Sequence, residues 1–498
     1  MKKALLLITF LVSSLFVFCQ MPARGDIVSF EVADSLSVSD IRALYTANGL
    51  PEFFAPINYP VNLYILVYAT PAPTGDSMTI ASGLVALPQN DTACFPMVEY
   101  NHGTLFYGQE MTQFGAEWFI SVPFSTAGYV MALPDYMGFG ASPLNIPHPY
   151  IHSESEASAS VDMMRATRQL CDSLEIGLNG EVFLSGYSQG GHSIMATFRD
   201  IETNYSAEFD IKAVGAGSGP YDVSGISTEN LLLEQPSNSF YLSFVMFSYD
   251  FIYGGLWNDP SEAFVAPYDS LLPLFYQRDN LMRPDPLFPD TAVRMLQPAF
   301  VQNVLSDSTH PWQMALRDND LYDWAPQAPL RMYYCEADEQ VSFENSIFAL
   351  SQFVANGSTQ AEAISIDPNL SHGACALPSI LNFKAWFDGL RGGCTSIVDT
   401  TASNDTTATF IDPGLFLTEQ VQLYPNPASE QVELSWTSQF NPYQILIYDQ
   451  GGKVLRDFSL ENQQEGVNIR LENLSNGIYF LRLKAKGGSL IKPLLIRK

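Results

Sequence analysis

Short apolar runs alternate with amphipathic stretches along the middle of the chain. The apolar runs are Met97–Tyr100, Tyr129–Leu133, Val182–Ser185, Ile211–Gly215, Leu330–Cys335 and Glu362–Ile366. Between Ser155 and Leu174, apolar residues recur at helical spacing, so one face of this helix can pack on a sheet. Strands that alternate with helices are typical of βαβ crossovers and a buried, mostly parallel sheet. The pattern therefore predicts an α/β fold.

Two departures from this alternation add detail. The runs Leu63–Thr70 and Met78–Leu87 flank the turn-rich residues 71–76, which predicts a hairpin before the parallel strands. The residues from about 220 to 327 interrupt the strand series and include an aromatic-rich stretch around Phe240 to Trp257. We interpret this segment as a cap inserted over the carboxyl edge of the sheet.

The pattern changes after Cys394. Residues 395–415 are rich in Thr, Ser, Asp and Asn and predict a linker. Residues 416–498 then show short alternating strands separated by turns, which predicts a small all-β, immunoglobulin-like sandwich. These strands are Gln431–Trp436, Tyr443–Tyr448, Lys453–Phe458, Val467–Leu471, Gly477–Lys484 and Leu490–Ile496.

The N-terminus is typical of an export signal. Lys2 and Lys3 precede an apolar run from Ala4 to Phe18, which is shorter than the roughly 20 residues that span a bilayer. We expect residues 1–19 to be a cleaved signal peptide, with a lipid anchor on Cys19 as the alternative. Residues 20–394 then form the predicted catalytic domain. No later segment predicts a transmembrane span.

Charge and cysteine content narrow the function further. The formal net charge of −29 repels nucleic acid, so no nucleic-acid partner is expected. The chain has six cysteines but no C-x-x-C pair, which argues against a zinc framework. Export permits disulfides, and Cys375 with Cys394 is the favoured pair, although buried thiols are an equal alternative.

Ser188 lies in a short glycine-rich motif between a predicted strand and a predicted helix. The sequence Gly186-Tyr187-Ser188-Gln189-Gly190-Gly191 is a G-x-S-x-G element between the strand Val182–Ser185 and a helical stretch from His192. This strand-turn-helix context is the one that a nucleophile elbow requires. Ser188 is therefore the candidate nucleophile.

A serine hydroxyl needs a base and an acid that orients the base. Of the six histidines, His372 follows the last core strand, as the order serine, acid, histidine demands. We expect a loop to place its imidazole over Ser188. Asp338 follows the strand Leu330–Cys335 and is the candidate acid, with Glu336 as the fallback.

The same arrangement needs donors for a developing oxyanion. The backbone amide of Gln189, directly after the nucleophile, is one candidate. The second is the amide of Thr104 or its neighbour, because Asn101-His102-Gly103-Thr104 ends the strand Met97–Tyr100.

Three segments together resemble the secretory lipases and related esterases of the α/β-hydrolase superfamily. They are residues 101–103, the Asp-Tyr-x-Gly-x-Gly segment within residues 133–142, and residues 186–191. The resemblance covers about Val61 to Leu390. It implies an α/β-hydrolase fold and hydrolysis of carboxylic esters through an acyl-enzyme, without a metal or organic cofactor.

The tail resembles the C-terminal sorting domain of the type IX secretion system of Bacteroidetes. The matching segments are Leu423-Tyr424-Pro425-Asn426-Pro427-Ala428, residues 448–454 and residues 474–479. The resemblance implies the type IX machinery as a partner and a secreted or cell-surface destination. A carbohydrate-binding sandwich is the alternative for this tail.

We therefore expect a secreted serine hydrolase that cleaves lipid or small-molecule esters with Ser188, Asp338 and His372. Two other functions stay open from the sequence alone. One is a serine peptidase on the same scaffold, and the other is a noncatalytic surface-binding protein.

Overall fold

The structure is a computed structural model in which residues 22–393 and 421–498 are described, apart from short gaps. The gaps are residues 49, 53–54, 76, 91–92, 107–108, 116, 233–238, 277–287, 426–427, 437–441, 449–453, 461–465 and 486–487. The predicted signal peptide, the predicted linker and Cys394 lie outside the described residues. None of the described helices is both long and apolar enough to cross a membrane.

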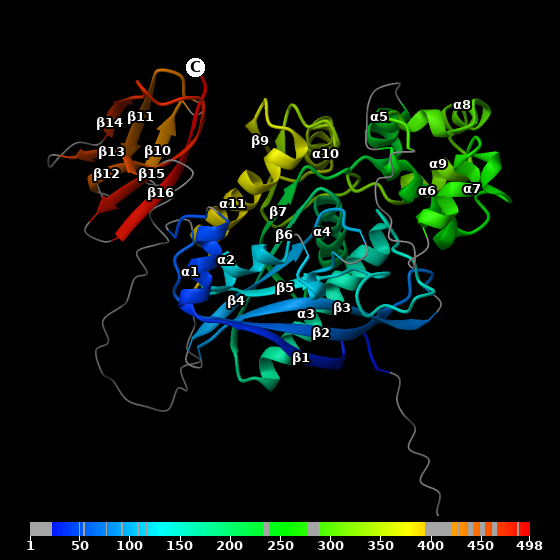
Figure 1. Cartoon of the computed structure of the whole chain (residues 1–498), viewed down its shortest axis with the longest axis horizontal. Helices are drawn as coiled ribbons and strands as arrows, with labels where there is room; N and C mark the ends of the chain where they lie inside the picture. Colours follow the sequence, from blue (N-terminus) through cyan, green and yellow to red (C-terminus); the bar gives the residue numbers. More distant parts are fainter. Residues whose placement is uncertain are drawn as a thin grey trace, which may run out of the picture.

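A nine-stranded sheet forms the centre of the first part, in the order β1-β2-β3-β5-β4-β6-β7-β8-β9 (Figure 1). Strands β4 to β9 run parallel, and β1, β2 and β3 add antiparallel pairs at one side. The strands are β1 Ile27–Leu36, β2 Val61–Pro71, β3 Met78–Pro88, β4 Cys94–Asn101, β5 Val130–Pro134, β6 Gly177–Tyr187, β7 Asp210–Gly217, β8 Leu330–Cys335 and β9 Ala361–Asp367. The predicted α/β-hydrolase fold class is confirmed.

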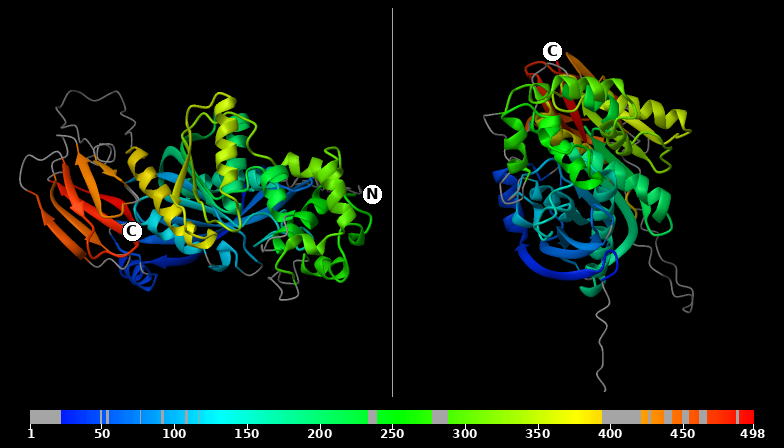
Figure 2. Two further views of the ribbon diagram at one scale, coloured as in Figure 1. Left: turned by 90° about the horizontal axis from the view of Figure 1, so that it is seen from above. Right: turned by 90° about the vertical axis from the view of Figure 1, so that its right-hand side faces the viewer.

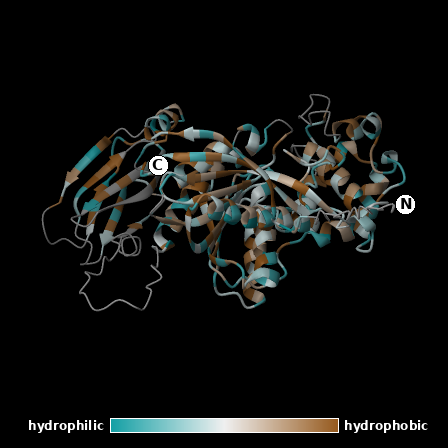
Figure 3. Cartoon of the chain, turned by 90° about the horizontal axis from the view of Figure 1, so that it is seen from below, coloured by the Kyte–Doolittle hydropathy of each residue, from teal (hydrophilic) through white to brown (hydrophobic). Residues whose placement is uncertain are grey.

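Helices cover both faces of this sheet (Figures 1 and 2). One apolar core lies between the sheet and helices α3 (Ser153–Ser173), α4 (Gln189–Asp200) and α10 (Glu344–Ala355). The other lies beneath α1 (Val38–Ala47), α2 (Ser121–Ser125) and α11 (His372–Leu390). The central strands β3, β4 and β5 are buried along most of their length, so their sequences are largely apolar. Figure 3 shows brown, hydrophobic stretches on strands of the sheet.

The chain between β7 and β8 contains five α-helices among the described residues: α5 Thr228–Leu232, α6 Phe240–Tyr253, α7 Tyr268–Phe275, α8 Pro298–Ser306 and α9 Pro311–Asp318. We call this helical insertion the cap. Its aromatic residues build a separate core, in which Phe247 stacks on Phe264 and Trp257 packs against Trp312. Tyr150 and Ile151, from the loop before α3, join the same core.

The tail folds into two small antiparallel sheets, in the orders β10-β11-β14 and β13-β12-β15-β16. The strands are β10 Val421–Tyr424, β11 Gln431–Trp436, β12 Pro442–Tyr448, β13 Val454–Ser459, β14 Gly466–Arg470, β15 Gly477–Ala485 and β16 Gly488–Ile496. Residues from both sheets, including Val432, Leu434, Ile445 and Leu481, share one core. Two sheets around one core match the predicted all-β region.

Candidate active site

Ser188 lies between the end of β6 and the start of α4, with an unusual positive φ of 61° and ψ −122°. The residues two positions before and two positions after Ser188 are glycines, and the turn leaves no room for a side chain at either one. A Cβ at Gly186 would lie 2.1 Å from the carbonyl oxygen of Gly190, and one at Gly190 would lie 1.9 Å from that of Asn101. The sequence therefore forces a sharp turn that holds Ser188 in a strained conformation at the sheet edge.

The structure brings the three predicted catalytic residues together. His372 Nε2 lies 2.8 Å from Ser188 Oγ, and His372 Nδ1 lies 2.7 Å from Asp338 Oδ2. Ser188 is 9% exposed and His372 is 6% exposed. The three groups form one line of hydrogen bonds, although 184 residues separate Ser188 from His372 along the chain.

Backbone hydrogen bonds hold the carboxylate of Asp338 in place beside the imidazole of His372. Its Oδ1 accepts hydrogen bonds from the backbone amides of Gln340, at 3.0 Å, and Val341, at 2.9 Å. Oδ2 is left to face His372, where it favours the tautomer that carries its proton on Nδ1. Glu336, the alternative acid in the sequence, is exposed and accepts from the Ser365 hydroxyl instead.

His372 differs from the expectation in one respect, because it is the first residue of helix α11 and not part of a loop. Ser371 caps this helix, since its hydroxyl accepts from the amide of Ala374. The backbone of His372 is held at both ends. Its amide donates to Glu339 Oε2 at 3.0 Å, and its carbonyl accepts from the hydroxyl of Tyr187 at 2.7 Å.

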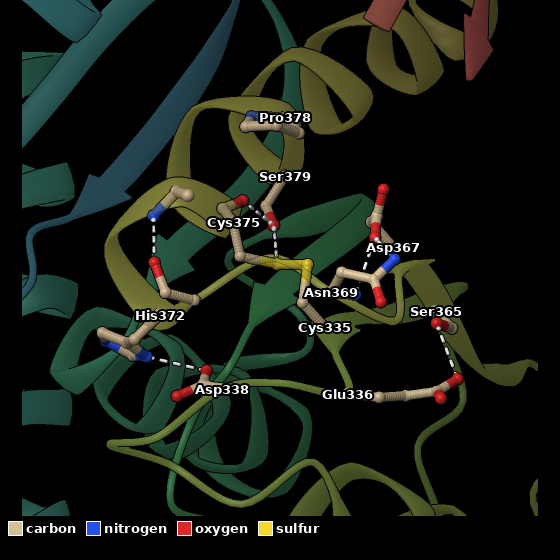
Figure 4. The surroundings of a disulfide bond; sticks show 12 residues. Cys335, Glu336, Asp338, Ser365, Asp367, Asn369, His372, Cys375, Pro378 and Ser379 are labelled. Carbon is tan, nitrogen blue, oxygen red and sulfur yellow. Dashed lines mark hydrogen bonds and ion pairs between the residues drawn. A yellow bond between two sulfur atoms is a disulfide. The ribbon is translucent and has the colours of Figure 1, made fainter. Parts of the chain in front are cut away.

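A disulfide joins the segments that carry Asp338 and His372 (Figure 4). Cys335, at the end of β8, is bonded to Cys375 in α11, with a Cα–Cα distance of 6.1 Å. The expected pairing of Cys375 with Cys394 is therefore wrong. The end of β8 lies beneath the first turn of α11. Cys375 is therefore bonded to a cysteine that lies 40 positions earlier in the chain.

The turn after β4 lies beside the nucleophile. The amide of Gly103 donates to both carboxylate oxygens of Glu117, at 3.2 and 3.3 Å, and Tyr100 donates to the same carboxylate at 2.7 Å. Burial raises the pKa of Glu117, while these hydrogen bonds oppose that rise. The Gly103 amide is therefore engaged by Glu117, and the hydroxyl of Thr104 lies 2.8 Å from that of Tyr150.

The Asp-Tyr-x-Gly-x-Gly segment makes buried contacts with the residues around the site. Asp135 Oδ2 accepts from the hydroxyls of Ser82 and Thr112, both at 2.7 Å, and burial raises its pKa. Gly138 has φ 83°, and a Cβ there would lie 2.3 Å from the amide nitrogen of His148. The segment therefore packs closely against the loop that carries His148.

A cavity opens above Ser188 and extends into the cap, enclosing about 1010 Å³ including space open to solvent. Ser188 and Gln189 line one end, and apolar side chains of α6, α8 and α9 line much of the rest, among them Met246, Val304 and Trp312. None of the described residues that line it is charged. Such a cavity suits a neutral, largely apolar substrate.

Comparisons with known proteins agree with this geometry. Residues 108–230 match the family model described as secretory lipase, and residues 422–497 match the secretion system C-terminal sorting domain. The chain carries a secretory lipase domain. It is a carboxylic ester hydrolase of the lipase and esterase type, and its sorting domain marks it as a secreted or cell-surface protein.

Several solved structures share the fold of the first part. A rice cell wall degrading esterase, LipA from Xanthomonas oryzae, is 26% identical with a TM-score of 0.66, and the match covers 74% of this chain and 100% of LipA. A putative hydrolase from Legionella pneumophila is 25% identical with a TM-score of 0.66, covering 76% and 100%. Candida antarctica lipase A, at 15% identity, a TM-score of 0.56 and coverage of 74% and 84%, shows the fold alone. A search of curated protein sequences finds no match.

Several residues that shape the site were not assigned from the sequence. Tyr187 and Glu339 hold the backbone of His372, and each directly precedes or follows a predicted catalytic residue. That adjacency was a usable signal. Glu117 had no such signal, because its contacts with Tyr100 and Gly103 join segments that are 14 to 17 positions apart.

Proposed function

We propose that the protein hydrolyses carboxylic esters by a two-step mechanism in which Ser188 is the nucleophile. Its Oγ attacks the ester carbonyl carbon while His372 Nε2 takes the hydroxyl proton. His372 then passes this proton to the leaving alkoxide, and the acyl group stays on Ser188. Water attacks the acyl-enzyme with the same imidazole as base, which releases the acid and restores the serine.

The observation that supports this proposal most is the continuous line from Ser188 Oγ through His372 to Asp338, with heavy-atom distances of 2.8 and 2.7 Å. The buried Asp338 carboxylate stabilises the imidazolium that forms when His372 accepts the proton. The amides of Gln189 and Thr104 are the proposed oxyanion donors. Removing one such donor typically costs about 100-fold or more in rate.

The proposed route of export follows from the two ends of the chain. We expect residues 1–19 to direct the chain to the periplasm and the sorting domain to engage the type IX secretion machinery.

The substrate class is a separate question. The LipA of Xanthomonas oryzae is described as degrading rice cell walls. The uncharged cavity here favours neutral lipid or small-molecule esters as the substrate class.

Replacing the nucleophile tests the mechanism directly. We expect Ser188→Ala to lower kcat for p-nitrophenyl esters by at least about 10⁴-fold and to abolish labelling by a fluorophosphonate. Ser351→Ala, at an exposed serine of α10, is the matched control and should keep both. Labelling at another residue, or undiminished hydrolysis by Ser188→Ala, would contradict the proposal.

The same assay separates the other functions that the sequence left open. Faster cleavage of aminoacyl-nitroanilides than of esters would indicate a peptidase. No hydrolysis by the intact protein over esters of increasing chain length would indicate a binding protein.

A further inference from the structure

A second chain of hydrogen bonds begins at Gln189, the residue directly after the nucleophile. The side-chain Nε2 of Gln189 lies 2.9 Å from Glu156 Oε1 and 2.8 Å from His148 Nε2. Glu156 Oε2 lies 2.7 Å from His192 Nδ1. Gln189, Glu156, His148 and His192 are each no more than 2% exposed. We call these four residues the Gln189 network.

The directions of these bonds are fixed by the available donors and acceptors. His148 Nδ1 lies 2.8 Å from the carbonyl oxygen of Met137, so it must carry the proton. His148 Nε2 is then an acceptor for Gln189, and burial lowers the pKa of His148 to about 3, which keeps the ring neutral. The second hydrogen of Gln189 Nε2 goes to Glu156. Both hydrogens of this amide are therefore used.

The network continues to the segment that returns from the cap. His192 Nε2 lies 3.1 Å from the carbonyl oxygen of Asn319, which can only accept. His192 Nε2 therefore donates there, and its Nδ1 faces Glu156. Asn319 follows α9, and its side chain accepts from the amide of Ser153 at the start of α3. Both ring nitrogens of the buried His192 therefore have hydrogen-bond partners.

The position of Gln189 gives these contacts a consequence for catalysis. Gln189 is the first residue of α4, and its backbone amide is a proposed oxyanion donor. Such a donor acts only when it is aimed at the oxygen before the reaction begins. A side chain anchored at two points restricts the rotation of the peptide that it belongs to.

We propose that Glu156 and His148 are positioning residues that aim the Gln189 amide at the oxyanion. This inference rests on the proposed function, because it presumes acyl transfer at Ser188. Neither residue touches the reacting atoms, and both act through the side chain of Gln189.

Esters and their thiono analogues measure this role, because a thiocarbonyl sulfur accepts hydrogen bonds weakly and gains less from the oxyanion donors. We expect Glu156→Leu to lower kcat for an ester about 10-fold with little change in KM, and to lower the rate for the thionoester far less. The ratio of the two rates should therefore fall. A purely structural role would lower both rates alike and leave the ratio unchanged.

Conservative and control variants complete the test. Glu156→Gln should keep most of the wild-type ester rate, since the new side-chain amide can accept from Gln189 and donate to Nδ1 of His192. Gln189→Met removes the anchored side-chain amide directly and should lower the ratio in the same way. It therefore tests the inference even if Glu156→Leu fails to fold. Thr197→Val, at a buried position of α4 outside the network, should leave the ratio at the wild-type value.

The outcomes are distinguishable from failure of the proposed function. An unchanged ester-to-thionoester ratio in folded Glu156→Leu or Gln189→Met overturns this inference alone, provided that Ser188→Ala is inactive. If Ser188→Ala stays active, the mechanism itself is wrong.

Discussion

The catalytic edge of the sheet and the cap above it are built by different kinds of interaction. At the edge, Ser188, His372 and Asp338 are held by directional hydrogen bonds, a strained turn and a disulfide. In the cap, aromatic rings such as Phe247, Phe264 and Trp312 pack against one another. None of the described residues that line the cavity is charged. The difference suggests that the edge sets the reaction and the cap sets which acyl groups enter it.

The largest effect in this comparison should come from the orienting acid. We expect Asp338→Asn to lower kcat by about 10³- to 10⁴-fold, because the neutral amide no longer favours the required tautomer of His372 or stabilises its cation. Steady-state hydrolysis of p-nitrophenyl esters is the measurement.

The chain provides a sharp control for this substitution. Glu336→Gln changes the other carboxylate that the sequence suggested as the acid. Glu336 is exposed, and its hydrogen bond is with Ser365 and not with His372. A rate loss in Glu336→Gln as large as that in Asp338→Asn would reverse the assignment of the acid.

The disulfide should have the next largest effect. Cys335 lies three residues before Asp338, and Cys375 lies three residues after His372, so the bond clamps the acid and base segments together. We expect the double variant Cys335→Ala/Cys375→Ala to lose about 10- to 100-fold in kcat, because small misplacements of catalytic groups are costly.

Activity and thermal unfolding measured on the same samples distinguish a local effect from global unfolding. The clamp predicts a loss of kcat in protein that is still fully folded at the assay temperature. Cys171→Ala removes a buried free thiol of α3 and should keep kcat. Full activity of the folded double variant would show that the disulfide does not position the triad.

The edge was far more predictable from the sequence than the cap. The G-x-S-x-G turn identified Ser188 because its glycines, its strand and its helix are contiguous, so one short segment carries the full signal. The order of the remaining elements then selected Asp338 and His372, and the structure places all three within hydrogen-bonding distance. Local chemistry and chain order were enough to select three side chains that lie together in the structure.

Features that depend on contacts between distant segments were not predictable. Cys375 was paired with the wrong cysteine, since nothing in the sequence states that β8 ends beneath α11. Strand β1 was missed because it is an edge strand whose Val28, Phe30 and Val32 are exposed, so it lacks a buried apolar run. The two partners of the Gln189 side chain, His148 and Glu156, lie 41 and 33 positions earlier in the chain, and no spacing rule connects them to it.

The smallest effect should come from the cap, where we expect a change in selectivity without a change in mechanism. Val304, in α8, lines the cavity and is 4% exposed. A phenylalanine there fills space that we expect to receive the acyl chain. Each methylene accommodated in an apolar pocket is worth on the order of 10-fold in kcat/KM. Val304→Phe should therefore lower kcat/KM for octanoyl and longer esters about 10-fold while changing that for butyryl esters less than about twofold.

The matched substitution Val354→Phe separates this steric effect from a general one. Val354 lies in α10, is 58% exposed and does not line the cavity, so its replacement should leave the chain-length profile unchanged. Equal losses for short and long esters in Val304→Phe would mean that the substitution disturbs the edge through the cap. Because the edge depends on bond geometry and the cap on occupied volume, only a loss that grows with chain length is consistent with the division of roles between them.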